Sequence, residues 1–382
     1  MSERDDFLRD RLRPASPAGP PPAQPPHAQA QHQPTMPLPA YPAPARPRPT
    51  AAPPPPRPAS VPHRPSPAWR PAPAKPVARP ARPQPTRGWR HVVLVATLGL
   101  VNLGPSLQER QEAQFEAAVR SVLRGNYKVG VLGKGGVGKT TVAASVGSIF
   151  AELRQQDRVV AVDADTAFGR LASRIDPRTQ TSYWELAADK NLRSFADVRA
   201  RVGTNSAGLH VLAGDSPTGR RRVLDPAIYR EAALRLDRHF TISIVDCGST
   251  MDAPVTQEAL RDLDALIVVS SPWADGASAA AQTMEWLAEH GRSGLLQRSV
   301  VVLNDSDGHA DRRTRSMLAR QFTDRGQKVV EVPFDPHLRP GGVIDVRSEM
   351  APATRRRFLE IAATVAQYFA SRPENARNRL AT

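Results

Sequence analysis

The spacing of apolar and polar residues changes near residue 127, and from there short apolar runs alternate with amphipathic stretches. The runs are rich in valine and isoleucine, which is typical of buried strands. We expect strands at residues 129–132, 159–162, 209–212, 242–245, 265–269, 300–303 and 328–332. Between most of them the apolar spacing predicts helices, at residues 140–154, 226–238, 277–290 and 311–322. This alternation predicts an α/β fold with a mostly parallel sheet covered by helices on both faces.

Weaker patterns flank this region. A closing helix is expected at residues 353–369, where apolar side chains recur at helical spacing: Phe358, Ile361, Ala362, Val365 and Phe369. We expect the apolar face of this helix to pack against the sheet; binding to a membrane or to a partner protein is the less favoured interpretation. Residues 92–103 are apolar, with no period that decides between strand and helix. Ser106 and Glu109 then form a capping-box pattern, which predicts a helix through Arg124 that packs on the main domain.

Composition separates a tail from the rest of the chain. Of the 39 prolines, 28 lie in the first 90 residues, where large apolar residues are few. Such a segment cannot bury enough surface to offset its ordering entropy. We therefore predict a disordered Pro/Ala/Arg-rich tail (1–88), a connecting segment with a packing helix (89–126), the main domain (127–372) and a flexible end (373–382).

The charge is as uneven as the proline content. The net charge is +15, and the first 90 residues carry +10 of it. The tail could therefore attract anionic lipid, nucleic acid or an acidic partner, or serve only as a solvated linker. A single cysteine, Cys247, excludes an internal disulfide and a cysteine-rich metal site. With no secretory signal pattern and no apolar run long enough for a bilayer, we expect a cytoplasmic protein without a transmembrane segment.

The strongest motif follows the first expected strand. It reads Gly133, Lys134, Gly135, Gly136, Val137, Gly138, Lys139, Thr140 and Thr141, which satisfies G-x-x-x-x-G-K-S/T. Glycines let successive N–H groups point at phosphate oxygens, and the following helix adds its positive end. Lys139 should reach the β- and γ-phosphates, Thr140 should ligate Mg²⁺, and Thr141 is placed for the α-phosphate. The pattern predicts a P-loop nucleotide site in a three-layer sandwich.

Carboxylates follow two other expected strands. Asp163 and Asp165 come at the end of one strand, and Asp246 ends an apolar strand in the Walker B arrangement. In α/β sheets these strand ends face the ligand crevice, where Asp246 would hold Mg²⁺ through water. Cys247 beside it is more simply a small buried residue, and no chemistry is assigned to it.

Lys134 in the variable part of the loop, with Gly135, Gly136 and Val137 after it, resembles the deviant Walker A motif of MinD/ParA-family ATPases. The resemblance covers about residues 127–369 and implies ATP and Mg²⁺ as cofactors. It implies that Lys134 reaches the partner's phosphates in a nucleotide-sandwich homodimer, which makes it catalytic together with Lys139 and Asp165. Asp165 would orient the attacking water and Asp163 would support the Mg²⁺ shell. The next residues, Thr166 and Ala167, depart from the family pattern, which leaves the hydrolysis rate open.

The base-binding residues rest on the same resemblance. Asn304 ends a strand where a family asparagine contacts adenine, and Pro333 and Asp335 match a Pro-x-Asp segment that lines the base. Residues 304–307 also resemble, without its lysine, the element by which GTPases recognise guanine. The missing lysine and the deviant loop favour ATP over GTP.

Features outside the phosphate site narrow the resemblance. Residues 101–106, Gly125-Asn126-Tyr127, Trp286-Leu287 and residues 333–338 look like the EspI-type MinD-like ATPases encoded with actinobacterial type VII secretion systems. That implies a slow, partner-stimulated ATPase switch that regulates or positions secretion machinery, with the tail contacting its components and a partner recruiting it to the membrane or cell pole. Two alternatives stay open. One is a ParA-like positioning protein on nonspecific DNA, which the domain's charge does not favour; the other is a nucleotide-sensing adaptor without hydrolysis.

Overall fold

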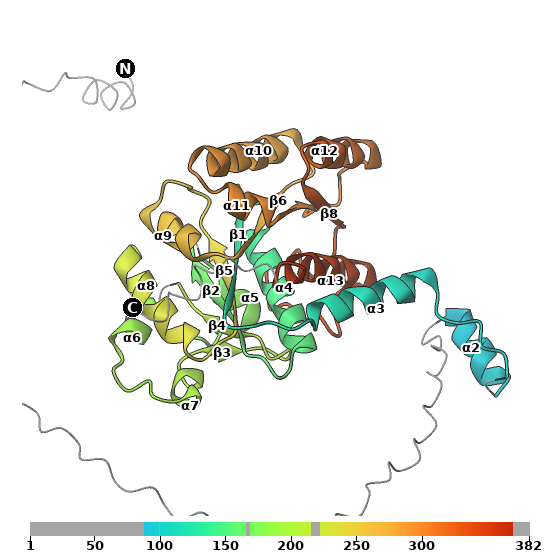
Figure 1. The fold of residues 1–382 in the computed structure, drawn as a ribbon, viewed down its shortest axis with the longest axis horizontal. Coiled ribbons are helices and arrows are strands. Elements are labelled where there is room, and N and C mark those ends of the chain that lie inside the picture. Colours follow the sequence, from blue (N-terminus) through green and yellow to red (C-terminus); the bar gives the residue numbers. More distant parts are fainter. Residues whose placement is uncertain (1–87, 99, 166–168, 215–221, 370–382) are drawn as a thin grey trace, which may run out of the picture. The chain divides into compact units, whose positions relative to one another are not determined.

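The computed structural model describes residues 88–98, 100–165, 169–214 and 222–369. Except for Gly88, the predicted disordered tail lies outside these residues, and so do the predicted flexible end and the departure at Thr166 and Ala167. The described strands form one eight-stranded sheet in the order β3-β4-β2-β5-β1-β6-β7-β8 (Figure 1). Every neighbouring pair is parallel except β3 and β4. The predicted α/β fold with a mostly parallel sheet is confirmed.

All seven predicted strands are present, most of them longer by one or two residues. The strands are β1 (Tyr127–Gly133), β2 (Val159–Ala164), β3 (Gly203–Thr204), β4 (His210–Leu212), β5 (Ile242–Cys247), β6 (Ala265–Ser270), β7 (Ser299–Asn304) and β8 (Lys328–Val332). The two-residue β3 was missed because it is too short to carry a hydrophobic period.

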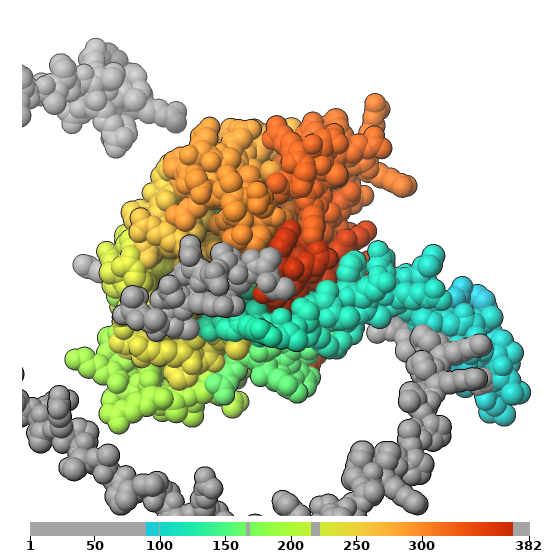
Figure 2. All heavy atoms as spheres, in the orientation of Figure 1, coloured from blue at the N-terminus to red at the C-terminus, as the bar shows by residue number. Residues whose placement is uncertain are grey.

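Helices cover both faces of the sheet and give the predicted three layers. One face is covered by α3 (Leu107–Val119), α4 (Lys139–Leu153), α5 (Leu171–Ile175) and α13 (Pro352–Ala366). The other is covered by α6 (Tyr183–Ala188), α7 (Phe195–Arg199), α8 (Pro226–Asp237), α9 (Pro254–Asp262), α10 (Ala274–Glu289), α11 (Ser293–Gln297) and α12 (Arg312–Asp324). α3 packs along α13, as Figures 1 and 2 show.

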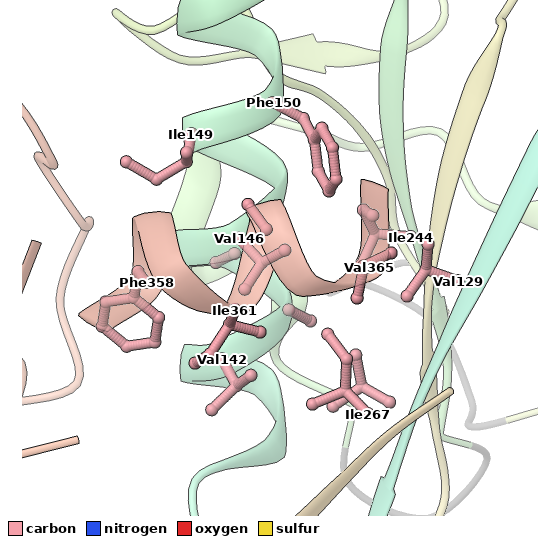
Figure 3. Packing of buried hydrophobic residues seen from close by; sticks show 14 of the residues in the cluster. Val129, Val142, Val146, Ile149, Phe150, Ile244, Ile267, Phe358, Ile361 and Val365 are labelled. Atoms are coloured by element: carbon pink, nitrogen blue, oxygen red, sulfur yellow. The ribbon is translucent and has the colours of Figure 1, made fainter. Parts of the chain in front are cut away.

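Two cores fill the spaces between these layers, because successive strand residues point to opposite faces. Val129 and Val131 of β1 join the core under α4 and α13, whereas Leu132 joins the other. Figure 3 shows side chains of α4 and α13 that meet beside the strands and share one core with them: Val142, Val146, Phe358, Ile361 and Val365 from the helices, and Val129, Ile244 and Ile267 from the strands. The closing helix therefore packs on the sheet, as predicted.

The segment before the sheet differs from expectation in one respect. The capping box is present: the Ser106 N–H donates to the Glu109 carboxylate (2.7 Å), and the Glu109 N–H donates to the Ser106 hydroxyl (3.2 Å). The prediction that α3 continues to Arg124 is wrong, since it ends at Val119. Arg154 donates to the carbonyls of Val119 (2.6 Å) and Ser121 (2.7 Å), which satisfies the end of the helix at that point. The sequence did not decide between strand and helix for residues 92–103. In the structure, residues 92–96 are the end of helix α2 (Gly88–Ala96), and the described residues from 97 to 103 are not helical.

Candidate nucleotide site

The loop between β1 and α4 has the backbone that a phosphate cradle needs. Gly133, Gly136 and Gly138 have φ angles of 151°, 85° and 95°. A Cβ on Gly133 would lie 2.2 Å from the Val269 carbonyl oxygen, and one on Gly138 would lie 2.4 Å from the Asn304 amide nitrogen. These positions therefore require glycine. α4 begins at Lys139, so its first N–H groups face the space that the loop encloses.

The two lysines of the loop have different surroundings. Lys139 is nearly buried, and its ammonium donates to the Lys134 carbonyl at 3.2 Å, which folds the side chain back over the loop. The Lys134 ammonium is half-exposed and pairs with the Asp275 carboxylate at 2.7 Å, beside the start of α10. Lys139 is thus placed for a ligand inside the loop, whereas Lys134 lies at the protein surface.

Two carboxylates lie buried behind the loop. Asp163 and Asp246 are direct neighbours in the pairing of β2 with β5, and each is at most 2% exposed. The Asp163 carboxylate accepts from the backbone N–H groups of Leu171 (3.0 Å) and Asp165 (3.2 Å). Both oxygens of Asp246 are buried without a hydrogen bond of normal geometry, although the Thr140 hydroxyl lies close enough to lower the pKa of this carboxyl. An orphaned buried carboxylate is costly, so a ligand that pairs with it is expected.

Burial raises the pKa of both carboxyls, and the charge of Asp246 raises that of Asp163 further. Thr140 and Lys139 beside Asp246 lower its pKa, but by less than burial raises it. Because Mg²⁺ is bound in proteins by one or two carboxylates together with substrate phosphates, Asp246 and Thr140 fit a Mg²⁺–nucleotide site. Among the described residues, no group of three or more His, Cys, Asp or Glu side chains could hold a metal, so phosphate oxygens would have to complete the coordination.

A cleft of about 510 Å³ opens in front of the loop at the carboxyl ends of the strands. In parallel α/β sheets this edge is where ligands bind. Predicted residues that line the cleft are Gly135, Gly136, Gly138, Lys139, Thr140, Thr141, Asp165, Asn304, Pro333 and Asp335. The lining does not include Gly133, Lys134 or Val137, and Asp163 and Asp246 lie behind it.

The predicted base-binding residues line the same cleft, and two of them already bind backbone. The Asn304 amide nitrogen donates to the Val137 carbonyl at 2.9 Å. The Asp335 carboxylate accepts from the N–H groups of His337 (3.0 Å) and Ala351 (2.9 Å). Both side chains therefore hold loops in place, while Pro333 supplies apolar surface to the cleft.

Sequence reasoning missed Arg174, which lies in α5 and lines the same cleft. Its guanidinium is buried and donates to the Thr141 hydroxyl (3.0 Å) and to the carbonyls of Leu338 (2.9 Å) and Gly342 (2.8 Å). It thus joins the phosphate loop to the loop after β8. Arg170 and Arg339 also line the cleft, and with Lys139 they give it a positive lining that suits a polyanion.

Comparison with known proteins agrees with this geometry. A sequence model described as the CobQ/CobB/MinD/ParA nucleotide binding domain matches residues 130–340, more than half of the chain. The chain belongs to this family. The match to the CobQ/CobB/MinD/ParA family includes the phosphate loop, all three aspartates and the cleft residues up to Arg339.

Within the CobQ/CobB/MinD/ParA family, the chain is similar to the ESX-1 secretion-associated protein EspI of Mycobacterium tuberculosis, strains CDC 1551 / Oshkosh and ATCC 25618 / H37Rv. The sequences are 34% identical over 286 residues, which is 74% of this chain. The chain spans 42% of the length of these curated relatives.

Solved structures of family members also align with the chain. The ParA family ATPase from Chlorobium tepidum TLS is 19% identical, with a TM-score of 0.46 over 64% of this chain and 98% of that one. The cell division ATPase MinD from Pyrococcus furiosus is 19% identical, with a TM-score of 0.47 over 64% and 99%. None of the helices in the part of the chain that the structure describes has the length and apolarity to span a bilayer.

Proposed function

We propose that this family member is an ATP-dependent molecular switch, which binds Mg²⁺ and ATP, dimerises, and hydrolyses ATP slowly to ADP and phosphate. The observation that carries the proposal is Asp246, whose buried carboxylate has no hydrogen bond of normal geometry and lies beside the Thr140 hydroxyl and the charge of Lys139. An apolar residue would be more stable there if the site held nothing. A cation shared with nucleotide phosphates accounts for the carboxylate.

Each group then has a distinct role. Glycine N–H groups and Lys139 would hold the phosphates, and Thr140 and Asp246 would hold Mg²⁺, supported by Asp163. When bound, Mg²⁺ would neutralise part of the negative charge of the phosphates. Asp165 lines the cleft and would orient the attacking water, which agrees with its place beside the phosphate loop.

The position of Lys134 supports the proposed dimer. Its ammonium lies outside the cleft of its own subunit, so it is available to reach the phosphates of a second copy. The Asp275 ion pair is exposed at both side chains, and such pairs are worth about 1 kcal/mol or less, so triphosphate could replace it. ATP would then close two subunits, and hydrolysis would release them.

The similarity to secretion-associated proteins supports a proposal for the partner of the switch. The similar curated proteins are named as secretion-associated, and this chain shares 34% identity with part of their length. We propose that the switch regulates or positions a type VII secretion system from the cytoplasm, and that the basic, proline-rich tail contacts its components.

Light scattering on the full chain tests the switch. With a nonhydrolysable ATP analogue and Mg²⁺ the mass should double relative to ADP, and Lys134→Ala should bind the analogue yet stay monomeric. Asp165→Ala should keep the dimer after incubation with ATP itself. Lys190→Ala removes another exposed lysine and should behave as the wild type. A Lys134→Ala protein that dimerises and hydrolyses normally would refute the sandwich.

A further inference from the structure

Exposed apolar side chains are concentrated in one short segment. Of the fourteen exposed large apolar residues among those described, eight lie within residues 89–107. Leu98 and Leu100 are 93% and 90% exposed, and Trp89 and Val92 are 65% and 64% exposed. Isolated apolar residues on a surface are ordinary, but a contiguous group of this kind marks an interaction site.

The start of the segment contacts its end. Leu94 of α2 is buried, and Arg90 donates to the Gly104 carbonyl at 3.5 Å. Trp89 and Val92 are three residues apart and therefore share a side of the helix, and Val95 continues the exposed row. The apolar row is thus presented outward instead of joining either core.

The charge of the segment points to an anionic surface. Residues 88–107 contain Arg90 and His91 and no aspartate or glutamate, although α3, which begins at Leu107, contains three glutamates further along. The first 90 residues carry +10, so basic residues lead directly into the apolar row. Tryptophan and arginine beside exposed aliphatic side chains are typical of helices that lie at the membrane–water boundary.

We propose that residues 88–98 and 100–107 dock on the surface of an anionic lipid bilayer, with α2 lying in the interface. A nine-residue helix is too short to cross a bilayer, so the segment lies on it. The apolar row enters the headgroup boundary, and Arg90, which lies beside Trp89, pairs with lipid phosphates. A bilayer fits better than a groove on a protein because the exposed row continues from the helix into irregular chain, which no single helix-shaped groove matches.

This inference is independent of the proposed nucleotide switch. Its residues lie outside the cleft lining, so Lys139→Ala should leave membrane binding unchanged even though it removes nucleotide. Loss of one activity is therefore distinguishable from loss of the other.

Cosedimentation of the full chain with lipid vesicles tests the proposal. The wild type should sediment with phosphatidylglycerol vesicles and stay in solution with phosphatidylcholine vesicles. The pair Val92→Glu and Val95→Glu should lower the partition by more than about tenfold, because two apolar side chains no longer enter the boundary. Val223→Glu is the matched control, since Val223 is an exposed valine outside the segment.

A second variant outside α2 guards against local unfolding of that helix. Leu98→Glu with Leu100→Glu should weaken binding similarly, and thermal unfolding of all variants should match the wild type. Unchanged partition of both double variants would show that the basic tail alone binds lipid and would overturn the proposal. The proposal would also be overturned if the wild type sedimented with neither kind of vesicle. A lower molar mass of the variants than of the wild type in light scattering would overturn it too, because it would identify the segment as a contact between copies of the chain.

Discussion

The predicted phosphate-binding residues (the phosphate end) and the predicted base-binding residues (the base end) use their polar side chains in opposite ways. At the phosphate end, the oxygens of Asp246 are buried without a hydrogen bond of normal geometry, and Lys139 lines the cleft. At the base end, Asn304 and Asp335 already donate to or accept from the backbone. The Asp246 carboxylate thus has no hydrogen bond of normal geometry within the protein, whereas the side chains at the base end hold loops of the protein in place.

This difference has a consequence for recognition. Side-chain substitutions at the phosphate end should change affinity for triphosphate strongly. Substitutions at the base end should act mainly through loop shape and should change the preference between ATP and GTP little. The following variants test that contrast in order of expected effect.

Lys139→Ala should have the largest effect. It removes a nearly buried cation from the phosphate loop, and the loss of a charged hydrogen bond there should weaken binding of an ATP analogue about a hundredfold or more. Titration calorimetry with Mg²⁺ measures this directly, with Lys190→Ala as the control. Affinity within a few-fold of the wild type would contradict the assignment of the phosphate end.

Asp246→Asn should act on both binding and stability. Binding should lose its dependence on Mg²⁺, because a neutral amide is a poor ligand for the cation. In EDTA without nucleotide, however, the variant should be the more stable protein at neutral pH.

The sign follows from the shifted titration of this group. Burial raises the pKa of Asp246 from 3.8 to about 7, so the folded state favours the protonated form. The contribution of this group to stability is complete below its unfolded pKa and is lost as the pH rises through the folded pKa. The melting temperature of the wild type should therefore fall between about pH 4 and about pH 7, and that of Asp246→Asn should fall less. Parallel melting curves for the two proteins would contradict this account.

Arg174→Lys should have a smaller effect on binding and a clear effect on stability. It keeps the charge but loses the planar fork that reaches three partners, which should cost about 2 kcal/mol in the free energy of unfolding. Analogue binding should weaken about tenfold because Thr141 loses its support. Arg178→Lys, at an exposed position nearby, is the control in urea unfolding. Unchanged stability would mean that Arg174 does not join the two loops.

The sequence predicts these regions unequally for a physical reason. The phosphate loop is contiguous, and the sheet strands are local runs of valine and isoleucine, so both leave a pattern in the chain. Arg174 bonds residues 33, 164 and 168 positions away, and such contacts leave no local signal. The early end of α3 depends in the same way on Arg154, which comes from the end of another helix. Short helices such as α5 and α7 have too few residues to show a period.

Asn304→Ala has the smallest expected effect, and it distinguishes most sharply between two roles of Asn304: support of the phosphate loop and recognition of adenine. If the amide mainly supports the Val137 carbonyl, its loss loosens the phosphate loop, so ATP and GTP analogues should weaken together, by about fivefold. AMP, which makes fewer contacts with that loop, should be affected less.

If Asn304 instead recognises adenine, the binding of ATP and AMP should weaken while the binding of GTP does not. Competition binding of the three nucleotides distinguishes the outcomes, and Asp335→Asn provides the comparison at the second brace. Because Asp335 accepts from Ala351 at the start of α13, its substitution should lower stability more than it changes the ratio of ATP to GTP affinity.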